Sequence, residues 1–96
     1  MNSLQLLTGG IGCDLVTGTN AFAARKGYIA AVVVNEDSTG ITHVKEMLNG
    51  TATTVTVRSY LGTNTLKENK LIVFDFPVSE IKLAAGSVWV FYMPGL

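Results

Sequence analysis

Charged residues, cysteine and histidine are scarce in this 96-residue chain. Only 15 % of the residues are charged, and there is one cysteine and one histidine. A single cysteine excludes an internal disulfide and a cysteine-based zinc site, which needs several ligands at set spacings. One unpaired thiol is consistent with a reducing compartment or with a particle assembled inside a cell. The chain therefore offers few residues for catalysis or for metal binding.

Neither an excess of one charge nor a long apolar run is present, and this argues against two classes of partner. The net charge is zero and no run of lysine and arginine occurs, so the sequence predicts binding neither to nucleic acid nor to a membrane. The longest apolar runs are Tyr28–Val34 and Val88–Met93, far shorter than the roughly 20 residues of a membrane helix. No positive segment precedes the first apolar residues, and we expect no signal peptide.

Apolar side chains are abundant instead, at 48 % of the residues. Typical soluble domains are about 25 % charged, and a chain of this length forms one small domain with a large surface to cover. The polar residues are too few for that surface, so we expect part of it to contact another subunit. The alternative is a soluble monomer whose exterior is rich in threonine, glycine and asparagine.

The stretch Asp75–Leu96 is expected to organise the fold. Residues 80–83 alternate between charged and apolar, small residues follow at 84–87, and residues 88–93 are apolar throughout. This pattern predicts a hairpin of two strands around a tight glycine turn. The second strand carries Trp89, Phe91 and Met93 on one face, and Val88, Val90 and Tyr92 on the other. A strand that is apolar on both faces must be covered on both, so we expect the core on one side and a subunit interface on the other.

Further strands are predicted upstream from β-branched runs and turn signals. Tyr28–Val34 is rich in β-branched residues and is bounded by a glycine and a polar loop. Asn49-Gly50 favours a type I′ hairpin turn, because both residues tolerate positive φ. Residues 53–61 alternate as a half-exposed strand, and residues 71–76 form another strand that Pro77 ends.

Residues 41–48 fit either a strand or a short amphipathic helix, and their leading β-branched residues favour the strand. The chain then has about six strands at spacings of roughly 8–12 residues, which is typical of a sandwich or barrel. We predict an all-β fold, a small antiparallel sandwich or barrel of jelly-roll type, in a single β domain at residues 28–96. Residues 1–27 contain closely spaced glycines and are predicted to be an extended N-terminal arm. Within it, residues 14–17 are a candidate for a brief strand.

The candidate catalytic residues have no suitable partners in the sequence. His43 would need an orienting carboxylate and a nucleophile, and the residues beside it on a strand supply neither. Cys13 lies next to Asp14, which disfavours a reactive thiolate. Gly10-Ile11-Gly12 lacks the third glycine of a dinucleotide loop and the lysine of a phosphate loop. We predict no catalytic, cofactor-binding or metal-binding residues, and hence no enzyme.

Aromatic residues are the candidates for a binding surface, because tryptophan and tyrosine are enriched at subunit interfaces. We expect the interface to include Trp89, Phe91, Tyr92, Tyr60 and Tyr28. The alternative is a carbohydrate- or ligand-binding β module in which Tyr60, Tyr28 or Trp89 stacks on the ligand.

Three stretches of the chain carry a likeness to a known class of protein: Leu6–Gly12 (LLTGGIG), Gly27–Asp37 (GYIAAVVVNED) and Ile81–Tyr92 (IKLAAGSVWVFY). They resemble small β-rich structural proteins of tailed-bacteriophage virions, namely capsid decoration, head-fibre and tail proteins. Those proteins often end in an apolar strand, a small-residue turn and a second apolar strand with a late tyrosine. Residues 41–61 have no counterpart in them, which leaves a position on the capsid and one in the tail both open.

The resemblance implies a non-enzymatic virion protein that is assembled in the host cytoplasm and forms a trimer or dimer. Its partners would be copies of the same chain and capsid or tail proteins, with no nucleic acid and no membrane. It implies no catalytic residues. The N-terminal arm is expected to become ordered on a partner surface, since extended segments can add a strand to a sheet edge.

Overall fold

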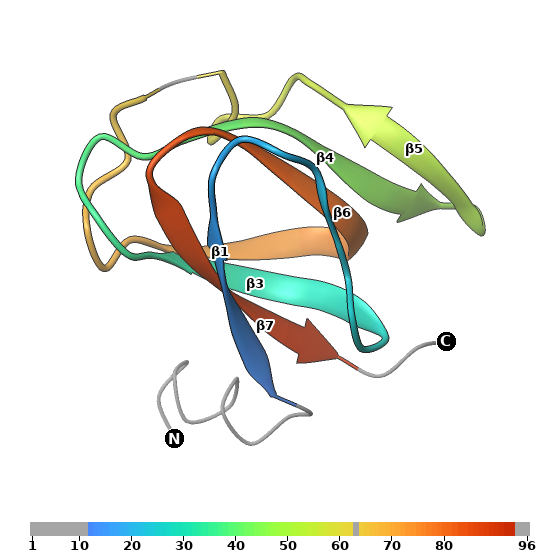
Figure 1. Cartoon of the computed structure of the whole chain (residues 1–96). Helices are drawn as coiled ribbons and strands as arrows, with labels where there is room; N and C mark the ends of the chain where they lie inside the picture. The colour runs from blue at the N-terminus through green and yellow to red at the C-terminus, as the bar shows by residue number, and fades with distance from the viewer. Residues whose placement is uncertain (1–11, 63, 94–96) are drawn as a thin grey trace.

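The computed structural model describes residues 12–62 and 64–93, and every regular element in them is a β-strand. The predicted all-β, antiparallel class is confirmed. The strands are β1 (Cys13–Thr17), β2 (Phe22–Ala23), β3 (Tyr28–Val34), β4 (Gly40–Leu48), β5 (Thr51–Val55), β6 (Leu71–Ala85) and β7 (Ser87–Met93) (Figure 1).

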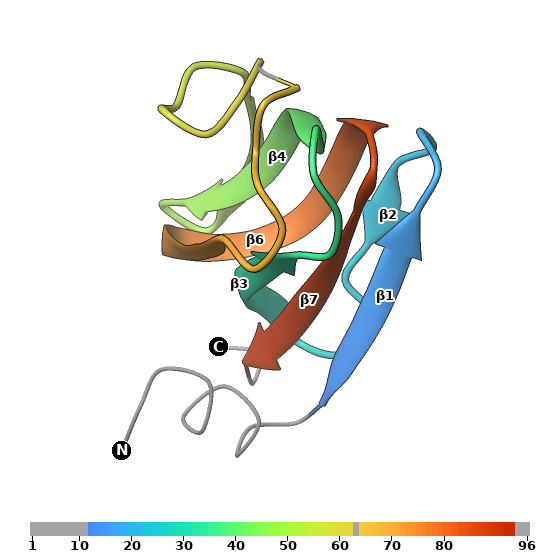
Figure 2. The same ribbon diagram turned by 90° about the vertical axis from the view of Figure 1, so that its left-hand side faces the viewer.

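The seven strands form one antiparallel sheet in the order β1-β7-β3-β6-β4-β5, with β2 paired to β6. The sheet bends around its inner face, so that β4 and β6 lie across from β7 and β1 (Figure 2). It does not close into a barrel, because β1 and β5 stand at its two ends. The predicted choice between a sandwich and a barrel is thus resolved as a single, strongly bent sheet.

The core lies on the inner face of the bend and draws on β1, β3, β4, β6 and β7 together with the loop after β5. Its buried members are Val16, Ile29, Val32, Val34, Ile41, Val44, Leu61, Ile72, Phe74, Val78, Ile81, Leu83, Val88, Val90 and Tyr92. One charged side chain, that of Glu46, is buried among the described residues. Arg58 meets it in a forked contact, with Nε 3.1 Å from Oε2 and Nη2 2.6 Å from Oε1, which compensates the buried charge.

Local sequence patterns give three elements correctly. β3 occupies Tyr28–Val34 as predicted, and residues 41–48 form β4 and not a helix. The turn between β4 and β5 has φ values of 52° at Asn49 and 78° at Gly50, in agreement with a type I′ turn. These predictions succeed because the signals lie within a few neighbouring residues.

β6 corrects the prediction that Pro77 ends a strand, since it runs without a break from Leu71 to Ala85. Its register against β3 shifts at this point: Ala31 is opposite Val73, whereas Ile29 is opposite Val78. The extra residues bulge out of the ladder, and a bulge is a place where proline's missing N–H costs no hydrogen bond.

β5 is shorter than the strand predicted over residues 53–61, because it ends at Val55. The chain then turns back so that Arg58 reaches Glu46 on β4, and the Leu61 N–H donates to the Arg58 carbonyl. Alternation continues in the sequence, but the side chains no longer follow it: Val57 is exposed and Leu61 is buried. The residues after Val55 thus contact Glu46 and the core in place of continuing the ladder with β4.

β6 and β7 also correct the predicted C-terminal hairpin, because the two strands do not pair with each other. β3 lies between them, so the chain turns a corner at Gly86. Gly86 has φ 77°, and a Cβ there would collide with Thr39 Oγ1 and lie 2.8 Å from Thr39 Cα. Only glycine fits this corner without displacing the β3–β4 loop.

The predicted N-terminal arm, residues 1–27, lies partly outside the described residues, as do Leu6–Ile11 of the resembling stretch. Within the described part, β1 pairs with β7 along its whole length and β2 pairs with β6. Cys13–Thr17, the region of the predicted brief strand, is thus an edge strand of the sheet.

Candidate interaction surface

The outer face of β1, β7, β3 and the start of β6 carries two apolar rows that cross the strands. Residues directly opposite each other on paired strands point to the same side of a sheet. One row is Leu15, Trp89, Val33 and Leu71, and the other is Cys13, Phe91, Ala31 and Val73. We call these residues the outer apolar face. None of them is acidic or basic, and they lie on the side of the sheet opposite the core.

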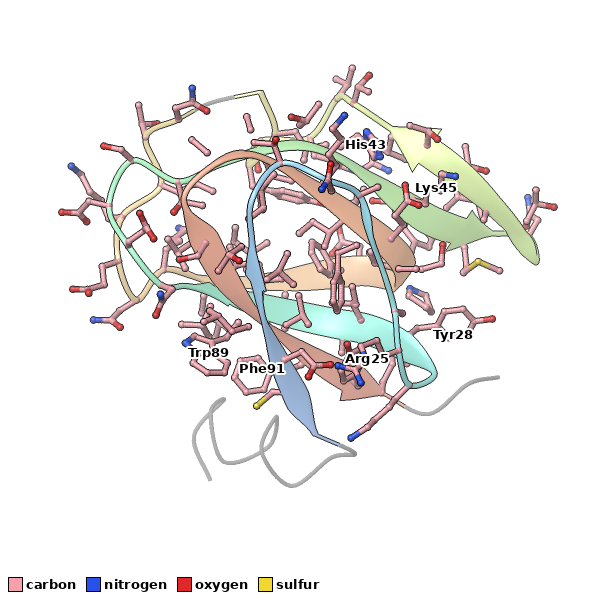
Figure 3. The ribbon with its side chains drawn as sticks, in the orientation of Figure 1. Arg25, Tyr28, His43, Lys45, Trp89 and Phe91 are labelled. Atoms are coloured by element: carbon pink, nitrogen blue, oxygen red, sulfur yellow. The ribbon has the colours of Figure 1, made fainter. Side chains whose placement is uncertain are left out.

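Much of this apolar surface is open to solvent. Of five large hydrophobic side chains exposed among the described residues, three belong to the face: Leu15 (43 % exposed), Val73 (62 %) and Trp89 (38 %). Figure 3 shows the rings of Trp89 and Phe91 side by side, on the side of β7 that points away from the body of the protein. The three side chains are 38–62 % exposed, so together they leave less than about 300 Å² of apolar area open, at the lower end of the largest patch on a typical monomer. A patch of this size occurs on ordinary monomers and is often functional.

The Trp89 side chain is held in place by a chain of hydrogen bonds from the β3–β4 loop. Its indole N–H donates to Asn35 Oδ1 over 3.1 Å, and Asn35 Nδ2 donates to Ser87 Oγ over 3.0 Å. The Ser87 hydroxyl in turn donates to Glu36 Oε2 over 2.7 Å. The indole therefore lies on the face in a fixed orientation, with its polar atom already satisfied.

The five aromatic residues expected at an interface do not lie on one surface. Trp89 and Phe91 belong to the outer apolar face, although Phe91 is only 6 % exposed. Tyr92 is on the inner face within the core, and Tyr60 packs against Phe74 with ring centroids 5.6 Å apart. Tyr28 is half-buried and lies far from Trp89, as Figure 3 shows.

The buried Tyr92 and the half-buried Tyr60 both have raised pKa values. Loss of solvent, together with a hydrogen bond of 2.7 Å to Asp14, raises the pKa of Tyr92 to about 12. Loss of solvent and the nearby Glu46 carboxylate raise the pKa of Tyr60 to about 12. These shifts reflect burial in the fold, and neither phenol is placed to act on a ligand at the face.

Leu15, Val33 and Val73 were not among the residues expected at an interface. Each of them alternates with a core residue on its own strand, so the signal for an outward apolar side chain was present. What was missing was the strand order, because only the placement of β1 and β3 on either side of β7 brings them beside Trp89.

On the other half of the sheet the outer face is polar. His43 and Lys45 on β4 lie opposite Lys82 and Glu80 on β6, and we call these four residues the polar outer face. His43 Nε2 is 3.1 Å from Glu80 Oε2, and Lys45 Nζ is 3.9 Å from the same oxygen. Glu80 thus supplies the carboxylate that the sequence did not reveal, but in the described structure no hydroxyl or thiol hydrogen-bonds His43.

Searches for other kinds of site and for similar proteins add no further assignment. Residues 12–62 and 64–93 contain no group of three or more histidine, cysteine, aspartate or glutamate residues that could hold a metal ion. In the same residues there is no apolar helix of the length needed to cross a membrane. Comparisons of the chain with family models, with curated proteins and with solved structures gave no match. The outer apolar face is therefore the feature on which a function can be argued.

Proposed function

We propose that this chain is a non-enzymatic structural protein of a virion, which associates with copies of itself and decorates a capsid or forms part of a tail. The observation that carries the self-association is the outer apolar face, a patch without acidic or basic side chains on the side of the sheet away from the core. The low charged fraction of 15 % points the same way. The assignment to a virion is supported by the resemblance to small phage structural proteins.

The size of the face limits how strong the contact can be. A standard interface buries about 800 Å² on each partner, well above the area that Leu15, Val73 and Trp89 expose. The face would then supply the apolar centre of the contact, and polar residues around it would form the rim. We expect a contact that responds to dilution, because the exposed apolar area is well below that of a standard interface.

The self-association is tested by measuring the mass of the protein in solution by light scattering, from about 1 μM to 1 mM. Val73→Lys places a charge on the exposed face without touching the core, and the variant should be monomeric where the unmodified chain is a dimer or trimer. Val57→Lys is the matched control, because Val57 is 80 % exposed and lies outside the face. An unmodified chain that is monomeric throughout, or a Val73→Lys variant of unchanged mass, would overturn the proposal.

The virion assignment needs its own test. Particles released from a lysed host culture would be banded on a density gradient and analysed by mass spectrometry. We expect the chain in the particle band at many copies per particle. Its presence in the soluble lysate alone would overturn the virion role and leave self-association standing.

A carbohydrate-binding module is the second candidate, and the fixed, partly exposed indole of Trp89 favours it. A flat aromatic ring in a fixed orientation can stack on a sugar. Tyr28 lies too far away to share such a site with Trp89 (Figure 3), and Tyr60 packs on the core. Quenching or a shift of tryptophan fluorescence in a screen of soluble glycans would favour this candidate over self-association.

A further inference from the structure

We propose that residues 56–62, which follow β5, form a strap that covers an edge of β4 and opens as a unit while the sheet stays folded. The buried ion pair between Glu46 and Arg58 is the latch of this strap. Three features support the proposal: the position of the strap beside β4, the few contacts that hold it, and the burial of the Glu46 carboxylate. None of them depends on the proposed self-association.

The strap lies beside a part of β4 that has a neighbouring strand on one side only. β5 pairs with β4 from Val44 to Leu48, so among the described strands residues 40–43 are paired with β6 alone. Here the Gly62 N–H donates to the Ile41 carbonyl over 2.9 Å, as the chain returns alongside β4 (Figure 1). An uncovered edge accepts an extended segment of another chain. The strap therefore occupies an edge that would otherwise be open to such pairing.

Few contacts hold the strap against the sheet. Leu61 is buried in the core, and the Tyr60 ring packs on Phe74, whereas residues 56–59 are exposed. A segment with few buried contacts and no ladder of its own opens at a lower free energy than the core strands around it. β4 and β6 pair with each other along most of β4, and that ladder does not involve the strap. The strap can thus open without unfolding the sheet.

The Glu46 carboxylate couples the ion pair to the position of the whole strap. The Glu46 side chain is 1 % exposed, and each of its oxygens accepts a hydrogen bond from the Arg58 guanidinium. Among the described residues no other side chain donates to it. A buried carboxylate that loses its cation is strongly destabilising, so Arg58 leaves only when water reaches Glu46. Water reaches it when the strap lifts, and the two events therefore occur together.

The first experiment measures amide hydrogen exchange of the unmodified chain at several urea concentrations below the unfolding transition. We expect the Leu61 and Gly62 amides to exchange at least about tenfold faster than those of β3, with little dependence on urea, because a local opening exposes little surface. Exchange of Leu61 and Gly62 with the same urea dependence as β3 would show that the strap opens only when the whole chain unfolds. That result would overturn the proposal and leave self-association untouched.

The second experiment tests the latch with trypsin, which cleaves after Arg58 in the strap and after Lys82 within β6. Cleavage after Arg58 reports on the open strap, and cleavage after Lys82 reports on global unfolding in the same sample. Glu46→Gln should raise the ratio of the two rates about tenfold. Glu80→Gln is the control, because it removes a carboxylate outside the strap, and it should change the ratio less than about twofold. An unchanged ratio in Glu46→Gln would overturn the pair as the latch.

A second variant covers the case in which Glu46→Gln does not fold. Arg58→Lys keeps one positive charge for Glu46 but loses the forked contact of the guanidinium. We expect the Leu61 and Gly62 amides of this variant to exchange about tenfold faster than in the unmodified chain, with the β3 amides changed less than about twofold. Equal acceleration at all of these amides would assign the ion pair to global stability and overturn its role as a latch.

Discussion

The two outer regions of the sheet share a strand and differ in their side chains. β6 begins beside β3, where Leu71 and Val73 belong to the outer apolar face. After the bulge at Pro77 it continues beside β4, where Glu80 and Lys82 belong to the polar outer face. The inner face of the same strand is apolar from end to end, with Ile72, Phe74, Val78, Ile81 and Leu83 in the core.

This difference separates what folding requires from what it does not. The core needs a largely apolar inner face on both halves of the sheet, and it has one apart from Glu46, which Arg58 pairs. The polar outer face shows that an outward polar surface is compatible with this fold. The apolar residues on the other half therefore need a different explanation, and contact with a partner is the explanation we propose. Four changes test the comparison, in order of decreasing effect.

The largest effect is expected at the corner that joins the two halves. Gly86→Ala combines backbone strain at φ 77° with a collision against Thr39, and we expect a loss of more than about 3 kcal/mol of stability. Gly50→Ala is the control, since φ is 78° there but no atom lies within 4 Å of the added Cβ. It should lose about 1 kcal/mol. Urea unfolding measures both, and equal losses would show that the contact with Thr39 is unimportant.

Truncation of the tryptophan should affect assembly more than folding. Trp89→Ala removes a side chain that is 38 % exposed, so we expect about 2 kcal/mol of lost stability, below the roughly 3–5 kcal/mol of a fully buried aromatic residue. The loss of self-association should be complete at concentrations where the unmodified chain is oligomeric. Calorimetry and light scattering on the same samples separate the two effects. A variant that unfolds outright would assign Trp89 to the fold.

Alkaline pH should lower the free energy of unfolding through two tyrosines, Tyr92 on β7 and Tyr60 in the loop after β5. An unfolded tyrosine ionises near pH 10, whereas burial raises the pKa of Tyr92 and of Tyr60 to about 12. The folded chain retains these protons longer, so the stabilisation is complete below pH 10 and is lost as the pH rises from 10 towards 12. Tyr92→Phe and Tyr60→Phe should each reduce this decline in denaturant unfolding. A decline that neither substitution changes would mean that other groups cause it.

The smallest effect is expected on the polar outer face. Glu80→Gln removes the carboxylate that contacts His43 and Lys45, and partly exposed pairs of this kind contribute about 0.2–1 kcal/mol. We expect a change in the unfolding midpoint near the limit of detection and no change in oligomer mass. A change in oligomer mass as large as that of Val73→Lys would place the contact on the polar outer face and not on the outer apolar face.

Elements whose signals lie in neighbouring residues could be predicted from the amino-acid sequence. β-branched residues located β3 and β4, and an unbroken apolar run located β7. Asn49-Gly50 located the turn, and alternation placed Trp89 and Val90 on opposite sides of one strand. Such signals depend on neighbouring residues, and the period of two follows from strand geometry alone. They do not say which strand lies beside which.

The order of the strands could not be predicted, because it depends on contacts between distant parts of the chain. β3 lies between β6 and β7, so these two strands are joined by a corner and do not form the expected hairpin. A bulge accommodates Pro77, and β6 therefore continues past it. The pairing of β1 and β3 with β7 joined Leu15, Val33 and Trp89 into one row and turned Tyr92 inward. Pairings between residues far apart in the chain set the strand order, and alternation within a strand carries no information about them.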